Sequence, residues 1–323
     1  MTTPRTSLPN TFPVTGFRWL VVGAGGTLGR AVTARLSGLG ADVVALARDG
    51  LDITDGRAVD EAVGAVRPGV VVNCAAWTAV DDAEAREEAA ARVNADGPRH
   101  LAAACAAAGS RLVHVSTDYV FDGAGRAGVP YDEDDAPGPR TAYGRTKLAG
   151  EHAVLTGLPD AAAVVRTAWL YGEDAHGTGP TGFVGTMARI ATGERRTVEV
   201  VDDQHGQPTW APDAAERIVA LGALPGAPAR GVFHATGGGA TTWYALAREV
   251  FRLVGADPAR VLPIGSERLT RPARRPEWSV LGHRRWPEAG LPPMRHWSEA
   301  LTEALTAAPG SAALGALPRT KGC

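Results

Sequence analysis

The sequence predicts an α/β fold: a doubly wound parallel sheet with a smaller α/β domain beside it. Three observations support this prediction. An apolar run at residues 17–22 leads into a glycine-rich turn at residues 23–29, and a helical pattern follows the turn. Apolar runs and helical patterns then alternate to about residue 170, as a parallel sheet requires. After residue 170 the alternation weakens, which indicates that a second domain begins there.

The glycine-rich turn is a predicted dinucleotide-binding site. Residues 17–22 and 42–47 are apolar enough for buried parallel strands, and the helical pattern between them is formed by Leu28, Val32, Leu36 and Leu39. Glycine lets the backbone approach a pyrophosphate, whose charge is stabilised at the N-terminus of the following helix. A tight turn that binds nothing is the alternative. The predicted cofactor-binding residues of this Rossmann-like turn are Gly23, Gly26, Thr27, Leu28 and Gly29.

The segments after the second and third strands supply further cofactor-binding candidates. Arg48 follows the second strand, where a positive charge suits the 2′-phosphate of NADPH. Asp49 comes directly after it and weakens this preference, so NADPH is favoured while NADH stays open. Residues 70–77 predict a third strand that ends at Ala75, Ala76 and Trp77, where small side chains let the backbone lie against a cofactor. A strand end that is merely packed is the alternative.

Thr117, Tyr143 and Lys147 are the predicted catalytic residues. Residues 111–116 predict a strand, and Thr117 follows it at the edge where doubly wound sheets bind ligands. Tyr143 and Lys147 are four residues apart, so on a helix they share one face at about 6 Å. The reference pKa of a phenol is about 10, and a nearby ammonium lowers it by favouring the phenolate. A surface helix that carries one aromatic and one charged residue is the alternative.

The composition is that of an ordinary globular protein. With 323 residues, of which 45% are hydrophobic and 21% charged, the chain can form one large or two modest domains. A formal net charge of −2 provides no broad basic field, so we expect neither a nucleic-acid nor a membrane partner. No apolar run reaches the roughly 18 residues of a membrane span. Cys74, Cys105 and Cys323 have neither metal nor disulfide spacing, which indicates a reducing, cytoplasmic compartment.

The motifs resemble those of the extended short-chain dehydrogenase/reductase superfamily, because the glycines have the spacing GxxGxxG and the catalytic pair the spacing YxxxK. Several segments narrow the resemblance to the dTDP-4-dehydrorhamnose reductase family. They include STDYVFDG at residues 116–123, the segment 143–151, RTAWLYG at residues 166–172 and DQHGQPT at residues 203–209. The resemblance extends over roughly residues 17–305.

This resemblance implies that a nicotinamide cofactor delivers hydride to the 4-keto carbon of a dTDP-4-dehydro-6-deoxyhexose. Among the sugars of this class the resemblance favours dTDP-4-dehydro-L-rhamnose, which would be converted to dTDP-L-rhamnose. Tyr143 would protonate the nascent alkoxide and Thr117 would hold the same oxygen. Lys147 would lower the pKa of Tyr143 and bind the nicotinamide ribose.

The resemblance also implies roles for residues that no local pattern singles out. In relatives, the pair equivalent to Asp52 and Ile53 flanks the adenine, and a tryptophan equivalent to Trp169 lies against the sugar. Asp118, which follows Thr117 in the STDYVFDG segment, is expected in the substrate site. An asparagine at the position of Asn94, within the helical stretch expected at residues 84–108, supports the active site in the superfamily; locally it is equally a polar residue that bends a helix.

The expected domain organisation combines the alternation with the resemblance. Residues 1–16 and 307–323 are expected to be tails, and residues 17–170 an NAD(P)-binding Rossmann domain to which residues of about 206–236 return. The substrate-binding domain is expected at residues 171–205 and 237–306. In its second part, Arg268, Arg271, Arg274 and Arg275 lie within eight residues, and guanidinium groups suit a diphosphate. Arg275 is the predicted substrate-binding member, with a solvated charge run as the alternative.

Two departures from the family pattern modify the expectations. Some bacterial relatives join two subunits through a magnesium ion held by glutamates, one of them early in the first helix, where this chain has Arg30 and Ala31. We therefore expect no metal site and no magnesium-bridged dimer, and the oligomeric state stays open. Gly182 precedes Phe183 where relatives usually have asparagine, and the glycine-rich segment 173–181 predicts a mobile substrate loop.

Other functions remain to be weighed against this reductase. The same chemistry could act on another dTDP-4-keto-deoxysugar of secondary metabolism. A non-catalytic, cofactor-binding regulatory subunit of the same fold is the alternative from another class, although it would not need Thr117, Tyr143 and Lys147 together. A dehydratase is disfavoured because such enzymes carry an acid pair after the threonine, whereas here Tyr119 follows Asp118.

Overall fold

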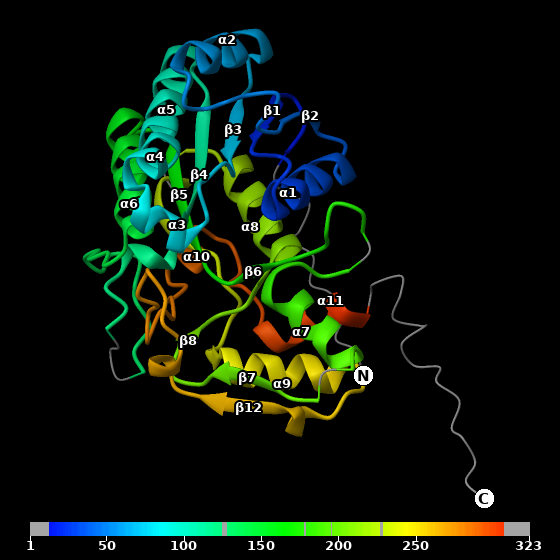
Figure 1. Cartoon of the computed structure of the whole chain (residues 1–323). Helices are drawn as coiled ribbons and strands as arrows, with labels where there is room; N and C mark the ends of the chain where they lie inside the picture. The colour runs from blue at the N-terminus through cyan, green and yellow to red at the C-terminus, as the bar shows by residue number, and fades with distance from the viewer. Residues whose placement is uncertain (1–12, 125–127, 178, 195, 227–228, 307–323) are drawn as a thin grey trace, which may run out of the picture.

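The computed structural model describes residues 13–124, 128–177, 179–194, 196–226 and 229–306 (Figure 1). The predicted tail at residues 307–323, and nearly all of the one at residues 1–16, lie outside these ranges. Six parallel strands form the central sheet. In spatial order they are β10 (Gly231–His234), β5 (Ala162–Thr167), β4 (Arg111–Thr117), β3 (Val70–Asn73), β1 (Arg18–Val22) and β2 (Asp42–Leu46).

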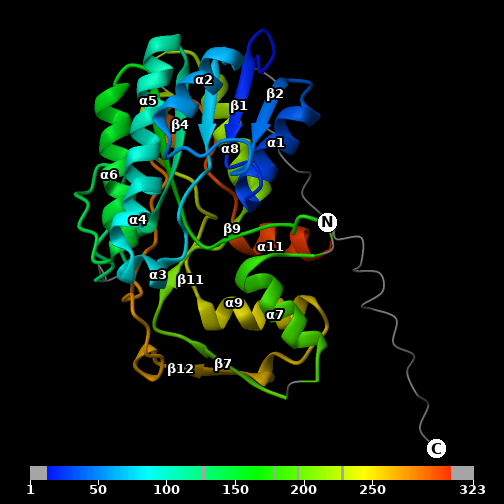
Figure 2. The same ribbon diagram turned by 45° about the horizontal axis from the view of Figure 1, so that its top comes forward.

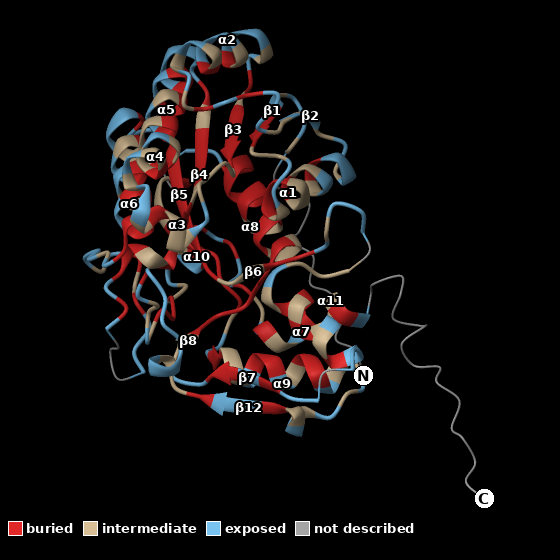
Figure 3. Cartoon of the chain, viewed as in Figure 1, coloured by how far each residue is buried: buried red, intermediate tan, exposed pale blue. Residues whose placement is uncertain are grey.

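Helices cover both faces of this sheet, so the predicted doubly wound fold is confirmed (Figure 2). Trp19 and Val21 of β1 pack with α1 (Thr27–Gly38) and α8 (Ala211–Ala223). The alternate residues of β1 point to the opposite face. There a second hydrophobic cluster includes residues of α2 (Gly56–Val66), α5 (Gly97–Ala108) and α6 (Ala142–Gly157). Burial follows the same arrangement: in Figure 3 the inner strands of the sheet are mostly red, while the edge strand β2 and the outer faces of the helices are tan or pale blue.

The strand order reverses between β1 and β3, and this reversal fixes where a ligand is expected. In the paired register, Val22 at the end of β1 lies opposite Leu46 of β2 and Asn73 of β3. The carboxyl ends of the three strands therefore form one edge. In doubly wound sheets the crevice beside such a reversal is the ligand-binding position.

The helical stretch expected at residues 84–108 is helical in the structure except at Arg86, but it is divided into several pieces. They are α3 (Val80–Ala85), α4 (Glu87–Ala91), a π-helical turn at Arg92–Asp96 and α5. A π turn inserts one residue into the helical repeat, and here it contains the buried Asn94. Asn94 Oδ1 accepts a 2.8 Å hydrogen bond from Trp77 N, and its Nδ2 donates to Thr146 Oγ1 at 3.1 Å. Asn94 thus lies in an irregular helical turn and also braces the loop after β3.

A separate hydrophobic cluster is built only from residues 171 onward. Its helices are α7 (Gly182–Thr192), α9 (Trp243–Leu253) and α11 (Trp297–Thr306), with the parallel pair β7 (Val198–Val201) and β12 (Val261–Ile264). These elements occupy the lower part of Figure 1. Two further short pairs of strands form in the later part of the chain. They are β6 (Leu170–Tyr171) with β9 (Thr209–Trp210), and β8 (His205–Gly206) with β11 (Thr241–Thr242). The predicted domain boundaries remain a proposal that this separate packing supports.

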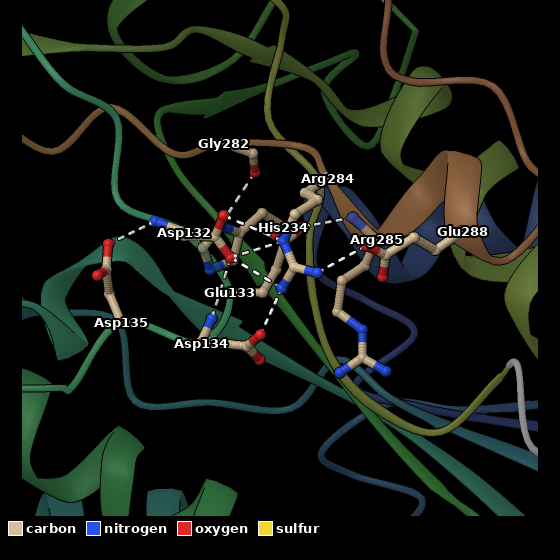
Figure 4. A network of polar contacts seen from close by, with 9 residues as sticks. All are labelled: Asp132, Glu133, Asp134, Asp135, His234, Gly282, Arg284, Arg285 and Glu288. Carbon is tan, nitrogen blue, oxygen red and sulfur yellow. Dashed lines mark hydrogen bonds and ion pairs between the residues drawn. The ribbon is translucent and has the colours of Figure 1, made fainter.

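The segment that leads into α6 is fastened to a segment much later in the chain (Figure 4). Tyr131 N donates to Val280 O at 2.8 Å, and Gly282 N donates to Tyr131 O at 2.7 Å. Arg284, just before α10 (Arg285–Glu288), forms ion pairs with Asp132, Asp134 and Glu288. These contacts hold the approach to α6 in place. No helix of the described residues is long and apolar enough to cross a membrane.

Candidate active site

The turn between β1 and α1 leaves room only for glycine at two positions. Gly23 has φ +74°, and a Cβ there would lie 2.4 Å from Ala75 N, in the loop after β3. A Cβ on Gly29 would lie 2.3 Å from Gly23 O. Gly26 caps α1 without any side-chain hydrogen bond, and the first turn of the helix has no acidic residue. The free N–H groups of this turn therefore suit the pyrophosphate of a dinucleotide.

A cavity of about 770 Å³ opens beside this turn. Eight predicted cofactor-binding residues line it: Gly23, Gly26, Arg48, Asp52, Ile53, Ala75, Ala76 and Trp77. Leu28 is buried in the core instead, so only its backbone is suited to contact a cofactor. Hydrogen bonds from Thr54 hold the pKa of Asp52 below its usual value, and the charge of Arg48 adds to this effect. The volume of this cavity and its lining of glycine, charged and apolar residues fit an NAD(P) molecule.

The three predicted catalytic residues lie at the junction of β4 and α6. Thr117 ends β4, Tyr143 is in the first turn of α6, and Lys147 follows one turn later. Thr141 begins the helix by accepting a 3.0 Å hydrogen bond from Gly144 N. All three catalytic candidates are almost fully buried. A hydrogen bond joins the side chains of Tyr143 and Thr117.

The position of Lys147 differs from the sequence-based expectation. Its Nζ donates a 2.7 Å hydrogen bond to Val115 O on β4 and lies 3.4 Å from His114 Nε2. Burial raises the pKa of Tyr143 to about 12, although the hydrogen bond with Thr117 opposes this rise. The expectation that Lys147 lowers the pKa of Tyr143 is therefore wrong for this structure, because the ammonium is directed towards the strand. Burial in turn lowers the pKa of Lys147 to about 8.

Asp118 is buried directly beside Thr117. Its Oδ1 accepts a 3.0 Å hydrogen bond from Thr117 Oγ1, which also accepts from Tyr119 N at 3.2 Å. Burial raises the pKa of Asp118 to about 6, against the effect of its hydrogen bonds. Tyr119 packs edge-on against Tyr143, with 5.6 Å between the ring centroids.

A second cavity, of about 390 Å³, has an aromatic wall. Trp169 stacks on Trp243 with 3.6 Å between ring centroids, and Phe183 lies 4.7 Å from Trp243. Trp169 has φ +45°, a backbone conformation that is rare outside glycine and typical of functional sites. Its indole lies against Gly206, where a Cβ would be 2.5 Å from the ring. No local sequence pattern singles out Trp243, because its stacking partner is distant in the chain.

Arg275 lines this second cavity but is already paired. Its Nη1 and Nη2 donate to the two carboxylate oxygens of Asp81, on α3, at 2.8 and 2.6 Å. Arg271 lines the same cavity and reaches Asp81 at 4.0 Å. The other two arginines of the cluster pair elsewhere, Arg268 with Glu199 and Arg274 with Glu277. No sequence pattern pointed to Asp81 as the partner of Arg275.

Tyr143 lines neither of these two cavities but shares a hydrophobic cluster with one residue from each. It packs in one small cluster with Trp77, which lines the first cavity, and Tyr119, which lines the second. Among the described residues, no group of three or more histidine, cysteine, aspartate or glutamate side chains is placed to hold a metal ion. The doubly wound sheet, the glycine turn and the buried Thr–Tyr–Lys set define an NAD(P)-dependent oxidoreductase of the extended short-chain type.

Comparison with known proteins identifies the family. The family model described as the RmlD substrate binding domain matches residues 17–309. The chain is 58% identical over 297 residues to a dTDP-4-dehydrorhamnose reductase of Streptomyces griseus, covering 91% of this chain and 95% of the relative. The chain therefore belongs to the RmlD family, and it is an NAD(P)H-dependent oxidoreductase of the dTDP-4-dehydrorhamnose reductase type.

Two further relatives are informative. The chain is 55% identical to a dTDP-4-keto-6-deoxy-D-glucose reductase of Streptomyces niveus, over 89% of this chain and 96% of that one. The crystal structure of a dTDP-4-dehydrorhamnose reductase from Bacillus anthracis, in complex with NADP, superimposes with a TM-score of 0.82 at 34% identity. That comparison covers 89% of this chain and 98% of the other.

Proposed function

We propose that the chain reduces the 4-keto group of a dTDP-4-dehydro-6-deoxyhexose, and that this sugar is dTDP-4-dehydro-L-rhamnose. The position of Tyr143 carries the proposal. Its ring shares one small hydrophobic cluster with Trp77 of the first cavity and Tyr119 of the aromatic cavity. A proton donor at this junction can serve a ketone that meets a nicotinamide there.

The side chains supply the acid chemistry of the reaction. Bound NADPH supplies the hydride. Tyr143, with a pKa of about 12, stays protonated near neutrality and can still protonate an alkoxide, which is a much stronger base. Thr117 holds the oxygen on which negative charge develops. Lys147 is assigned the nicotinamide ribose, for which its ammonium must leave Val115 O or share it.

The second cavity supports a sugar nucleotide as substrate. A planar aromatic wall of Trp169 and Trp243 suits the apolar face of a deoxyhexose ring. Arg271 and Arg275 place two guanidinium groups on the same cavity, and such groups bind phosphate oxygens well. Asp118 is assigned to the substrate site because it adjoins Thr117. The relatives from Streptomyces griseus and Streptomyces niveus act on sugars of this class by name.

NADPH is the proposed cofactor. Arg48 lines the first cavity, where a guanidinium suits a 2′-phosphate, and the relative from Bacillus anthracis was solved with NADP. Arg30 binds Glu173 O at 2.9 Å, in the place where a carboxylate would be needed for a magnesium-bridged dimer, and we propose no such bridge. Cys74 and Cys105 are free thiols, which supports a reducing, cytoplasmic compartment.

A second candidate keeps the chemistry and changes the sugar. The relative from Streptomyces niveus, named a dTDP-4-keto-6-deoxy-D-glucose reductase, is almost as similar as the one named a dTDP-4-dehydrorhamnose reductase. The test follows the absorbance of NADPH with dTDP-4-dehydro-6-deoxyglucose, with and without a 3,5-epimerase. Oxidation only with the epimerase supports the rhamnose step, and oxidation without it supports the second candidate. No oxidation in either case contradicts both and favours a regulatory subunit.

A further inference from the structure

Behind the catalytic helix, buried polar side chains connect Lys147 to the loop of the cofactor cavity. Lys147 Nζ lies 3.4 Å from His114 Nε2 on β4. His114 Nδ1 lies 3.0 Å from Asn73 Nδ2 at the end of β3. Asn73 Oδ1 accepts a 3.0 Å hydrogen bond from the backbone N–H of Ala75, which lines the cavity. His114 and Asn73 are completely buried, and neither has a place in the reaction described so far.

The backbone at Ala75 determines which way the Asn73 amide faces. An N–H group requires an acceptor, so the amide atom that faces Ala75 N is the oxygen. The amide nitrogen therefore faces His114 and donates to its Nδ1. A neutral imidazole that accepts at Nδ1 carries its proton on Nε2. The N–H of the His114 ring consequently points towards Lys147.

This tautomer disfavours the charged form of Lys147. An ammonium group can only donate hydrogen bonds, so it finds an acceptor at Val115 O but a second donor at His114 Nε2. A neutral amine has a lone pair, and it can accept from the imidazole while it donates to Val115 O. The same two contacts also hold the lysine nitrogen against β4.

We propose that Asn73 and His114 are positioning residues that fix the place and the charge state of Lys147. The proposal rests on the proposed function, in which Lys147 binds the nicotinamide ribose of the cofactor. Neither Asn73 nor His114 is assigned a contact with substrate or cofactor. They act only through Lys147.

The other groups around Lys147 are consistent with this role. Burial lowers the pKa of Lys147, while the charge of Glu151 opposes that effect. Glu151 is itself bound by Arg166 through two hydrogen bonds of 2.9 and 2.7 Å, both buried. Burial and the charge of Lys147 keep the pKa of His114 well below its usual value, so its ring is neutral.

Asn73→Asp tests the proposal because it reverses the direction of the hydrogen bond between the side chain of residue 73 and His114 Nδ1, while the shape of the side chain hardly changes. A carboxylate accepts from both Ala75 N–H and the ring, so the proton of His114 moves to Nδ1 and Nε2 becomes an acceptor for the ammonium. In the wild-type enzyme, kcat should fall as the pH rises through about 8, where Lys147 loses its proton. In the variant this fall should occur about one pH unit higher or more. An unshifted fall would overturn the proposal.

Two controls separate the imidazole from the added charge. In the first control, Asn73→Asp is introduced into a His114→Leu variant, which has the added carboxylate but lacks the imidazole. If the pH at which kcat falls shifts by the same amount there, the proposal is overturned. His152→Gln removes an exposed histidine from the same helix as Lys147 and should leave the pH profile unchanged.

The tautomer can also be read without substrate or turnover. The ¹⁵N chemical shifts of the His114 ring in histidine-labelled enzyme should show the proton on Nε2 in the wild type and on Nδ1 in Asn73→Asp. A wild-type ring protonated on Nδ1, or on both nitrogens near neutral pH, would contradict the inference. An inactive enzyme with the expected tautomers would refute the proposed function alone, whereas an active enzyme with the wrong tautomer would refute only the inference.

Discussion

At the scale of single residues, burial determines the acid-base properties of the site. The pKa of Tyr143 is raised to about 12 and that of Lys147 is lowered to about 8, each chiefly by burial. The sequence-based expectation considered only the attraction between the two side chains. It could not weigh desolvation, because the depth of a helix face beneath other elements is not encoded in the spacing of two residues.

Tyr143→Phe should lower kcat by about 10²–10⁴-fold, the usual contribution of a positioned general acid. The phenyl ring keeps its packing against Trp77 and Tyr119, so the binding of NADPH should change little. Steady-state kinetics and fluorescence titration with NADPH measure the two effects. Tyr244→Phe, in the first turn of α9, is the matched control and should retain full activity. Retention of full activity by Tyr143→Phe would exclude this residue as the proton donor.

At the scale of secondary-structure elements, the irregular helix before α5 supports the cofactor cavity. Its π turn places Asn94 so that one side chain binds both the N–H and the C=O of Trp77. The sequence shows only an alanine-rich helical pattern at residues 84–108, with one asparagine in it. An inserted residue leaves the composition and the approximate period unchanged, and therefore the break could not be predicted.

Asn94→Ala should destabilise the protein by about 1–3 kcal/mol, because the backbone groups of Trp77 lose their buried partners. We also expect a higher KM for NADPH, since Trp77 lines the cavity. Urea unfolding and initial rates at varied NADPH measure these changes. Arg92→Ala alters an exposed residue of the same turn and should change neither quantity. Equal behaviour of the two variants would contradict the supporting role of Asn94.

At the scale of the whole molecule, local sequence patterns predicted the sheet and the first cavity. They did not predict the contacts between segments that are distant in the chain. The strands at residues 18–22 and 70–73 are largely buried apolar runs, while the strand at residues 42–46 lies at the edge of the sheet and is only partly buried. Gly23 and Gly29, between the first two strands, occupy positions that admit no side chain. The pairing of Arg275 with Asp81 joins segments 194 residues apart. Nothing near either residue indicates the other, because the pairing follows from how the later segments pack on α3.

Substitutions of Arg275 and Asp81 distinguish a role in substrate binding from a role in holding the fold. Arg275→Ala should raise the KM for the sugar nucleotide about tenfold, as expected for the loss of a charged hydrogen bond. Asp81→Ala leaves the guanidinium free for the diphosphate and should not raise this KM, although both variants lose the same ion pair. Initial rates at varied substrate and thermal unfolding separate the effects. An equal rise in KM for both variants would show that the pair only maintains the fold.

The stacked indoles of Trp169 and Trp243 give the enzyme a built-in optical reporter. Two rings with centroids 3.6 Å apart influence each other's excited states, so their emission depends on their separation and on what fills the adjacent cavity. A sugar that settles against Trp169 should change that emission before any chemistry takes place. Binding of a sugar nucleotide can thus be measured with an oxidised cofactor or with no cofactor. The affinities of different sugar nucleotides can then be compared without any turnover.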